Sequence, residues 1–388
     1  MTLPVVRRPV PLAAGLAVWL ASALLLAGCS NGSQAPTGAG GPDTAESSES
    51  SATSPAPSGP TSEPTAGSPS DDAGTTSTQD PTQEPARPPD PVSVAALSAA
   101  EHTGDRLRLG AVRERTSAYT SYDVTYRATT TDDRGTRRFT ISGVLNVPTG
   151  RGPFPAVVLA HGYIDPAYYV RGQGMTRERG VLASRGYVAL HVDYRGHAES
   201  TDDPRSDRDL RLGYSADVLA AVTALRAARG VPVDDDRVAL MGRSMGGGVV
   251  MKALVAEPGL VQAAALWASV SSLEGENFDQ FIRPDGDARR DAIVRAHGLP
   301  ERRPAFWRAV SARPYLDEVT EPVLLVHGRY DDTCPPRWAS ATQRAMQRAG
   351  VDSTLAWYDD GHAFGPAFTA AMDRTIRYLD QELDVRRG

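Results

Sequence analysis

The 388-residue sequence predicts an α/β fold with a mostly parallel central sheet, and two observations lead to this prediction. Short, continuous apolar runs recur at residues 156–160, 187–192, 237–241, 263–267, 323–326 and 354–357. Such runs are typical of strands that are buried on both faces of a parallel sheet. Helix-like segments separate most of these runs, at residues 175–184, 214–229, 245–256, 336–348 and 366–383. Strands that alternate with helices indicate βαβ units.

Two segments depart from this alternation. Tyr119–Arg127 and Arg138–Val147 have the period of strands, and the turn sequence at residues 132–135 between them predicts an antiparallel hairpin. Residues 271–315 are rich in charge, proline and aromatic side chains, and we expect this insertion to be a lid or cap. Four of its aromatic side chains are Phe278, Phe281, Phe306 and Trp307. They predict either an apolar substrate pocket or the cap's own core.

The N-terminus has the pattern of an export signal. Arg7 and Arg8 precede an apolar run at residues 13–26, which is too short to span a membrane comfortably. The run ends in Leu26-Ala27-Gly28-Cys29, which resembles the lipobox of bacterial lipoproteins. This resemblance implies a signal peptide at residues 1–28, a lipid on Cys29, and a protein anchored at the outer face of the cytoplasmic membrane. The alternatives are an ordinary signal peptide with an incidental cysteine, and a retained transmembrane anchor.

Residues 29–93 have a different composition, and we expect them to form a disordered tether. Large apolar side chains are scarce there, so the segment cannot offset the entropy of ordering its backbone. Nine acidic residues and one arginine give the segment a charge of −8, against −6 for the whole chain. The remaining charge is therefore near +2, and so weak a basic field argues against a nucleic-acid partner. Residues 94–388 are expected to form one large domain.

Ser244 is the candidate nucleophile. It lies in Gly242-Arg243-Ser244-Met245-Gly246, between an apolar strand-like run and a helix-like run. A serine at a sharp strand-to-helix turn needs small neighbours, because the turn brings backbone segments close together. A phosphate-binding loop is the rival interpretation, but no Gly-Lys-Ser/Thr follows.

A serine hydroxyl needs a base, and an acid should orient that base. In one known chain order the acid follows the serine and the histidine follows the acid. Of the histidines after Ser244, His297 lies in the insertion and His327 ends a strand, so His362 is the expected base. The preceding loop offers Asp331 and Asp332, and their spacing does not choose between them. Two further acids, Asp359 and Asp360, are too close to His362 along the chain to be favoured.

The oxyanion that forms in acyl transfer needs backbone N–H donors. One donor is expected from Met245, directly after the nucleophile. The second should come from the loop His161-Gly162-Tyr163 after the strand at residues 156–160, and we expect the Tyr163 amide to be that donor. The Tyr163 ring either lines the pocket or packs in the core.

Five motifs in the right order give residues 119–388 a resemblance to the α/β-hydrolases. They are LAHGY (159–163), DYRGHAES (193–200), GRSMGGG (242–248), HGRYDDTCP (327–335) and DGHAF (360–364). The sequence is most similar to the prolyl oligopeptidase catalytic domain and to dienelactone-hydrolase-like esterases. The resemblance implies an α/β-hydrolase fold and places the acid at Asp331. It also implies that Arg195 and His197 support the site without acting in it.

The sequence also departs from the pattern of that family. Cys334 stands where valine is usual, and Ala198 replaces a common glycine. Arg243 replaces a common histidine or glycine, and its role is not evident from the sequence. Peptidase members often have tyrosine at the position of Met245, and they carry a large N-terminal propeller for which the expected tether leaves no room. These last two departures favour esters over peptides as substrates.

The sequence therefore predicts an exported serine hydrolase that cleaves small carboxylic esters through an acyl-enzyme, without a metal or other cofactor. Short peptides are the alternative substrate. A catalytically silent lipoprotein that uses the fold for binding is the non-enzymatic alternative, and the intact set of Ser244, Asp331 and His362 argues against it.

Overall fold

The computed structural model describes residues 89–386. The expected signal peptide, Cys29 and nearly all of the expected tether lie outside these residues. Within the described range no helix combines the length and the apolar character needed to cross a membrane.

A nine-stranded sheet is the centre of the described fold, with the order β1-β2-β3-β5-β4-β6-β7-β8-β9. Neighbouring strands are antiparallel in the part of the sheet β1-β2-β3-β5. They are parallel in the rest of the sheet, which has the order β5-β4-β6-β7-β8-β9. The strands span β1 Glu101–Arg115, β2 Tyr119–Asp132, β3 Gly135–Pro148, β4 Phe154–Ala160, β5 Val188–Val192, β6 Val233–Arg243, β7 Ala263–Trp267, β8 Val323–Gly328 and β9 Ser353–Tyr358. The predicted parallel sheet and antiparallel hairpin are both confirmed.

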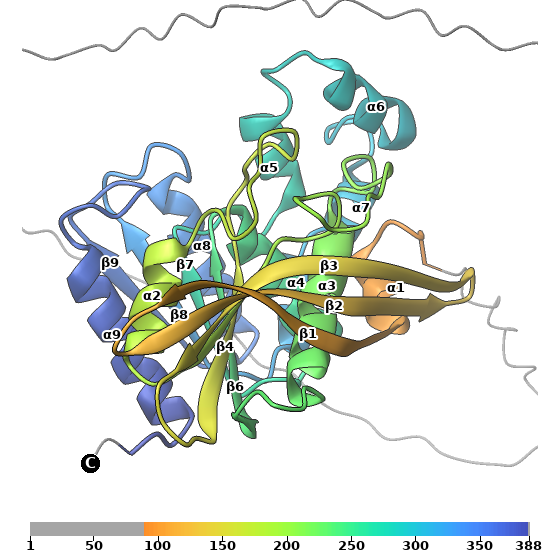
Figure 1. The fold of residues 1–388 in the computed structure, drawn as a ribbon. Helices are drawn as coiled ribbons and strands as arrows, with labels where there is room; N and C mark the ends of the chain where they lie inside the picture. The colour runs from red at the N-terminus through yellow and green to blue at the C-terminus, as the bar shows by residue number, and fades with distance from the viewer. Residues whose placement is uncertain (1–88, 387–388) are drawn as a thin grey trace, which may run out of the picture. The chain divides into compact units, whose positions relative to one another are not determined.

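Helices cover both faces of the sheet. They span α1 Val94–Ala99, α2 Thr176–Ser184, α3 Leu212–Arg226, α4 Met245–Ala256, α8 Pro336–Arg348 and α9 Phe368–Glu382. Figure 1 shows α2 and α9 together on one side of the sheet, and α3 and α4 on the other. The buried apolar residues form two main clusters on these two sides, because the parallel strands are apolar on both faces.

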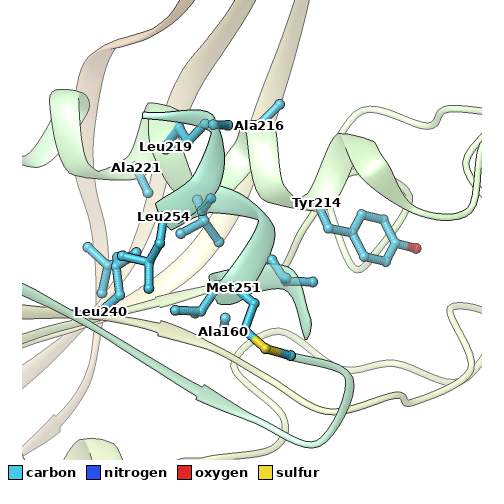
Figure 2. Packing of buried hydrophobic residues seen from close by; sticks show 14 of the residues in the cluster. Ala160, Tyr214, Ala216, Leu219, Ala221, Leu240, Met251 and Leu254 are labelled. Carbon is cyan, nitrogen blue, oxygen red and sulfur yellow. The ribbon is translucent and has the colours of Figure 1, made fainter. Parts of the chain in front are cut away.

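Helix α4 is almost entirely buried behind the site. Every residue from Gly246 to Ala256 is buried, and all of them except Lys252 are glycine or apolar, as expected for a helix that packs between a sheet and other helices. Leu254 of α4, Leu219 of α3 and Leu240 of β6 belong to the same apolar cluster (Figure 2). This packing fixes the N-terminus of α4, which follows Ser244 directly.

The insertion between β7 and β8 contains helices α5 Glu274–Phe281, α6 Ala288–His297 and α7 Pro304–Ala309, followed by the 3-10 helix η1 Arg313–Glu318. Figure 1 shows α5, α6 and α7 gathered at one end of the fold, above the sheet. We refer to residues 271–315 as the cap.

Strand β1 was not predicted from the sequence. Most of its side chains beyond Asp105 are exposed on both faces, and its pairing with β2 shifts register three times. An edge strand of this kind shows no regular alternation of apolar and polar residues, because neither face is consistently buried.

Candidate active site

The predicted site residues gather at the carboxyl edge of the parallel strands. Ser244 follows β6, Asp331 lies three residues after β8, His362 lies four residues after β9, and Tyr163 lies three residues after β4. The chain passes from β4 outward to β5 and then returns to place β6 on the other side of β4. Sites in open α/β sheets form at such a reversal of strand order, because loops there diverge and leave a crevice.

The turn at Ser244 is strained and tightly packed. Ser244 has φ 56° and ψ −122°, a conformation that L-residues rarely adopt. A Cβ added at Gly242 would lie 2.3 Å from the Gly246 carbonyl oxygen, and one at Gly246 would lie 1.9 Å from the Ala160 oxygen. The glycines are therefore needed for the close approach of β6, α4 and β4, which is the geometry of a nucleophile elbow.

Three side chains form a hydrogen-bonded relay. The Nε2 atom of His362 lies 3.1 Å from the Oγ of Ser244. Its Nδ1 atom lies 2.9 Å from Oδ2 and 3.1 Å from Oδ1 of Asp331. With Nδ1–H donated to the carboxylate, Nε2 is free to accept the serine proton, which is the arrangement that base-assisted attack by a serine requires.

The structure separates Asp331 from its neighbour Asp332. The Asp331 side chain is fully buried and accepts further hydrogen bonds from the amides of Thr333 (3.0 Å) and Cys334 (2.7 Å), whereas Asp332 is exposed. Asp359 pairs with Arg329 at 3.0 Å, and Asp360 accepts amide hydrogen bonds within its own loop. Of the four acids, Asp331 is therefore the one that the fold places against His362.

Two backbone segments pass close to Ser244, the loop after β4 and the first turn of α4. Met245 is the first residue of α4, so its N–H has no partner within the helix. The loop after β4 passes beside the serine, because a Cβ on Gly162 would lie 3.1 Å from Ser244 Cβ and 3.7 Å from its Oγ. The fold thus brings the Met245 and Tyr163 segments to Ser244 from the ends of two different strands.

A buried cluster of rings supports the loop after β4. His161 donates from Nδ1 to the Gly162 carbonyl at 2.6 Å, and the Tyr194 hydroxyl donates to the His161 carbonyl at 3.0 Å. The His161 ring stacks on Tyr169 and His191 at centroid distances of 4.8 and 5.3 Å. Burial lowers the pKa of His161 to about 3, so this ring is neutral and serves as a packing and hydrogen-bonding group.

Arg195 and His197 lie in this supporting cluster and not beside Ser244. The buried Arg195 guanidinium binds the Asp217 carboxylate, with Nη2 at 2.7 Å from Oδ1. Burial lowers the pKa of His197, whose ring meets Tyr169 edge-on at 4.9 Å. Both residues therefore occupy the supporting position that the family resemblance implied.

A cavity of about 840 Å³ opens over Ser244 and His362, and the cap forms one of its walls. Phe281, Ile282 and Arg289 of the cap line it. The aromatic residues of the cap divide between the two predicted roles, because three of them pack in a buried cluster and one faces the cavity. The buried three are Phe278, Phe306 and Trp307.

Tyr163 and Cys334 have distinct surroundings. The Tyr163 ring lines the cavity and is 48% exposed, so it is not a core tyrosine. Cys334 is fully buried beside Val270 and Trp338, and burial raises the pKa of its thiol to about 12. This thiol is a packing group.

Comparison with known proteins shows to which family the chain belongs. The sequence profile of the prolyl oligopeptidase family matches residues 174–385, more than half of the chain. The chain belongs to the prolyl oligopeptidase family. This family member is 26% identical over 188 residues to 2,6-dihydropseudooxynicotine hydrolase of Paenarthrobacter nicotinovorans, covering 48% of the chain and 47% of that relative. It is 24% identical over 210 residues to an uncharacterized peptidase, YuxL, of Bacillus subtilis, covering 53% of the chain and 30% of that relative. The matches thus span about half or less of these relatives.

Solved structures of similar fold include an acetyl xylan esterase from Paenibacillus sp. R4, with a TM-score of 0.52 and 20% identity over 74% of this chain and 92% of the esterase. They also include a putative dipeptidyl aminopeptidase IV from Bacteroides ovatus, with a TM-score of 0.50 and 19% identity over 73% of this chain and 43% of the other. At this level of identity the likeness concerns the fold, which this prolyl oligopeptidase family member shares with an esterase and a peptidase alike.

Proposed function

We propose that this protein is a serine hydrolase that cleaves small carboxylic esters through an acyl-enzyme intermediate. The relay from Ser244 through His362 to Asp331, set at the base of the capped cavity, is the observation that carries the proposal. Ser244 attacks the ester carbonyl while His362 takes its proton, and His362 then returns the proton to the departing alcohol. Water, activated by the same histidine, releases the acid.

The remaining groups have supporting roles in this proposal. Asp331 orients His362 and stabilises its protonated form. The amides of Met245 and Tyr163 donate to the oxyanion, and each such donor is worth about 100- to 1000-fold in rate. Apolar residues of the cavity, among them Leu210, Val249 and Ile293, favour an uncharged acyl or alcohol group.

A peptidase acting on short peptides is the second candidate. The family match and the peptidase relative favour it, whereas Met245 at a position where peptidases of the family often have tyrosine favours esters. Initial rates with aryl acetates and with aminoacyl anilides separate the two. Faster cleavage of the anilides at equal concentration would overturn the ester assignment and leave the serine mechanism intact.

A fluorophosphonate probe tests the nucleophile directly. The wild type should be labelled and Ser244→Ala should not, whereas Ser98→Ala, an exposed serine of α1, should be labelled like the wild type. Equal labelling of wild type and Ser244→Ala would refute the assignment of Ser244. A folded wild-type protein that takes up no probe and cleaves no ester would instead point to the catalytically silent binding protein.

We also propose that the protein is exported and held at the outer face of the cytoplasmic membrane by a lipid on Cys29. The signal-like sequence at residues 1–28 supports this proposal. An alkyne fatty acid fed to expressing cells should be incorporated into the wild type and not into Cys29→Ser. Equal incorporation into both would refute the lipid anchor.

A further inference from the structure

Arg243, directly before Ser244, links two distant segments of the fold. Its Nη1 atom lies 3.0 Å from Oε1 of Glu178 in α2, and its Nη2 donates to the backbone carbonyl of His362 at 2.9 Å. The Glu178 side chain is 1% exposed and that of Arg243 is 16% exposed. One planar guanidinium thus joins α2 to the residue that would serve as the base.

Arg177, the neighbour of Glu178, binds the same loop. Its Nη1 donates to the carbonyl of Phe364 at 3.0 Å and its Nη2 donates to the carbonyl of Ala363 at 2.8 Å. Its guanidinium also lies over the ring of Phe368, 4.1 Å from the centroid. Two arginines therefore hold three consecutive carbonyls, at residues 362–364, and both arginines are anchored at α2.

The loop that carries His362 depends on such contacts for its position. Residues 359–367 lie between β9 and α9 without regular secondary structure, and in the described part of the chain the carbonyls at residues 362–364 accept no backbone hydrogen bond. Phe364 is fully buried, has φ 51°, and packs on Trp267 at a centroid distance of 4.8 Å. Asp331 orients the imidazole ring, but the ring reaches Ser244 only if the backbone of His362 is correctly placed.

We propose that Arg243, Glu178 and Arg177 form an arginine clamp that positions the His362 backbone so that Nε2 stays within hydrogen-bonding distance of Ser244. This inference rests on the proposed function, because it assigns the three residues to the support of its base. They are positioning residues. They are not among the residues that line the cavity in the described part of the chain, so the clamp has no direct role in substrate binding. Its effect is on geometry, where a displacement of about 1 Å can cost about 100-fold in rate.

Arginine is needed at this position because one side chain must contact both Glu178 and the His362 carbonyl. A guanidinium presents several N–H donors in a fixed plane, so it can bind Glu178 and the His362 carbonyl simultaneously. A lysine at this position keeps the charge but has a single ammonium, which cannot reproduce both contacts. The buried Glu178 carboxylate has its charge balanced by Arg243 at 3.0 Å, so the two residues should act as one unit.

The test compares Arg243→Met, Arg177→Met, Glu178→Gln and a matched control, Arg185→Met. Arg185 directly follows the last residue of the same helix and pairs with Asp373 of α9 at 2.9 Å. Turnover of an aryl acetate is measured per active site, with sites counted by fluorophosphonate labelling run to completion and folding checked by thermal melting. We expect kcat to fall about 10- to 100-fold for Arg243→Met with KM within about twofold. The exposed Arg177→Met should lose less, and Arg185→Met should match the wild type.

Two further variants probe the mechanism of the clamp. Arg243→Lys should recover part of the lost kcat. Full recovery would refute the claim that both guanidinium contacts are needed. The double variant Arg243→Met/Glu178→Gln should lose no more than Arg243→Met alone, because the partners act as a unit. Strictly additive losses would count against the clamp.

The control with Ser244→Ala separates the two hypotheses. If Ser244→Ala retains full turnover, the proposed function fails. If Ser244→Ala is inactive but Arg243→Met and Arg177→Met keep the kcat of Arg185→Met per labelled site, the proposed function stands and the clamp is refuted. A change confined to KM would also refute it.

Discussion

The two walls of the cavity are built in different ways. The wall formed by the sheet carries Ser244, Asp331 and His362 at the ends of buried strands, and hydrogen bonds of 2.9–3.1 Å connect these side chains. The cap wall is an insertion whose buried Phe278 joins the apolar cluster of α3 and α4, and polar contacts also tie it to the rest of the domain. One of these joins Lys252 to Glu274, and another joins His297 Nε2 to the Arg208 carbonyl at 2.7 Å. The difference suggests that the reaction depends on the sheet wall and the choice of substrate on the cap.

The largest expected effect lies in the sheet wall, at the two adjacent aspartates. Asp331→Asn keeps an oxygen that can accept the Thr333 and Cys334 amides but removes the charge beside His362. We expect kcat for an aryl ester to fall about 10⁴-fold, as replacement of the acid does in serine triads. Asp332→Asn alters an exposed side chain, so its kcat should stay within about twofold of the wild type. Equal losses in the two variants would show that the buried acid has no special role.

The second prediction concerns how the stability of the fold depends on pH. Burial is the main cause of a lowered pKa for His102, His161, His191, His197 and His327, all of which lie outside the cap. The pKa of His161 falls from 6.5 to about 3 on folding. Between these two pH values, His161 binds more protons in the unfolded chain than in the folded chain. Its contribution to the free energy of unfolding is therefore largest above pH 6.5 and decreases progressively as the pH falls toward 3.

Denaturant unfolding between pH 7.5 and 5 measures this effect. The free energy of unfolding should decrease toward low pH, and His161 should contribute about 1.4 kcal/mol per pH unit once the pH is well below 6.5. His161→Asn cannot titrate, and it should reduce the slope by about that amount. An unchanged slope in this variant would mean that His161 takes up its proton in the folded state.

The sequence was informative where function depends on local pattern. The apolar strands, the hairpin and the glycines around Ser244 follow from spacing alone, because period and backbone strain are local properties. The choice of Asp331 over Asp332 required the family resemblance, since only the fold buries one of them. The placement of these residues in the structure agrees with their expected roles, which remain to be tested.

Residues that act across long separations were not predictable. Arg243 reaches His362 across 119 positions and Glu178 across 65, and no local pattern signals either contact. Among the aromatic cap residues, composition could not separate Phe281, which lines the cavity, from Phe278, which is 1% exposed and belongs to the main apolar cluster. Their burial depends on how α5 and α7 pack, and this is a tertiary property.

The smallest expected effect lies where the two walls meet, at Tyr163. The Arg289 guanidinium of the cap lies 5.6 Å from the centroid of the Tyr163 ring, and its Nη1 is 3.4 Å from the Tyr163 hydroxyl. Arg211 of the opposite wall lies 4.7 Å from the same ring. An exposed cation–π contact contributes about 0.5–1 kcal/mol, so its loss in Arg289→Met should change KM by about two- to fivefold.

The same variant should leave kcat unchanged, because hydrogen bonds from His161 and Tyr194 hold the backbone before Tyr163 independently of the cap. Arg290→Met is the matched control, since Arg290 is the next residue of α6, pairs with Asp291 at 2.8 Å, and does not line the cavity. Its KM and kcat should equal those of the wild type. A tenfold fall in kcat for Arg289→Met would contradict the division between the walls, because the cap would then be needed to place the oxyanion donor and would take part in the reaction itself.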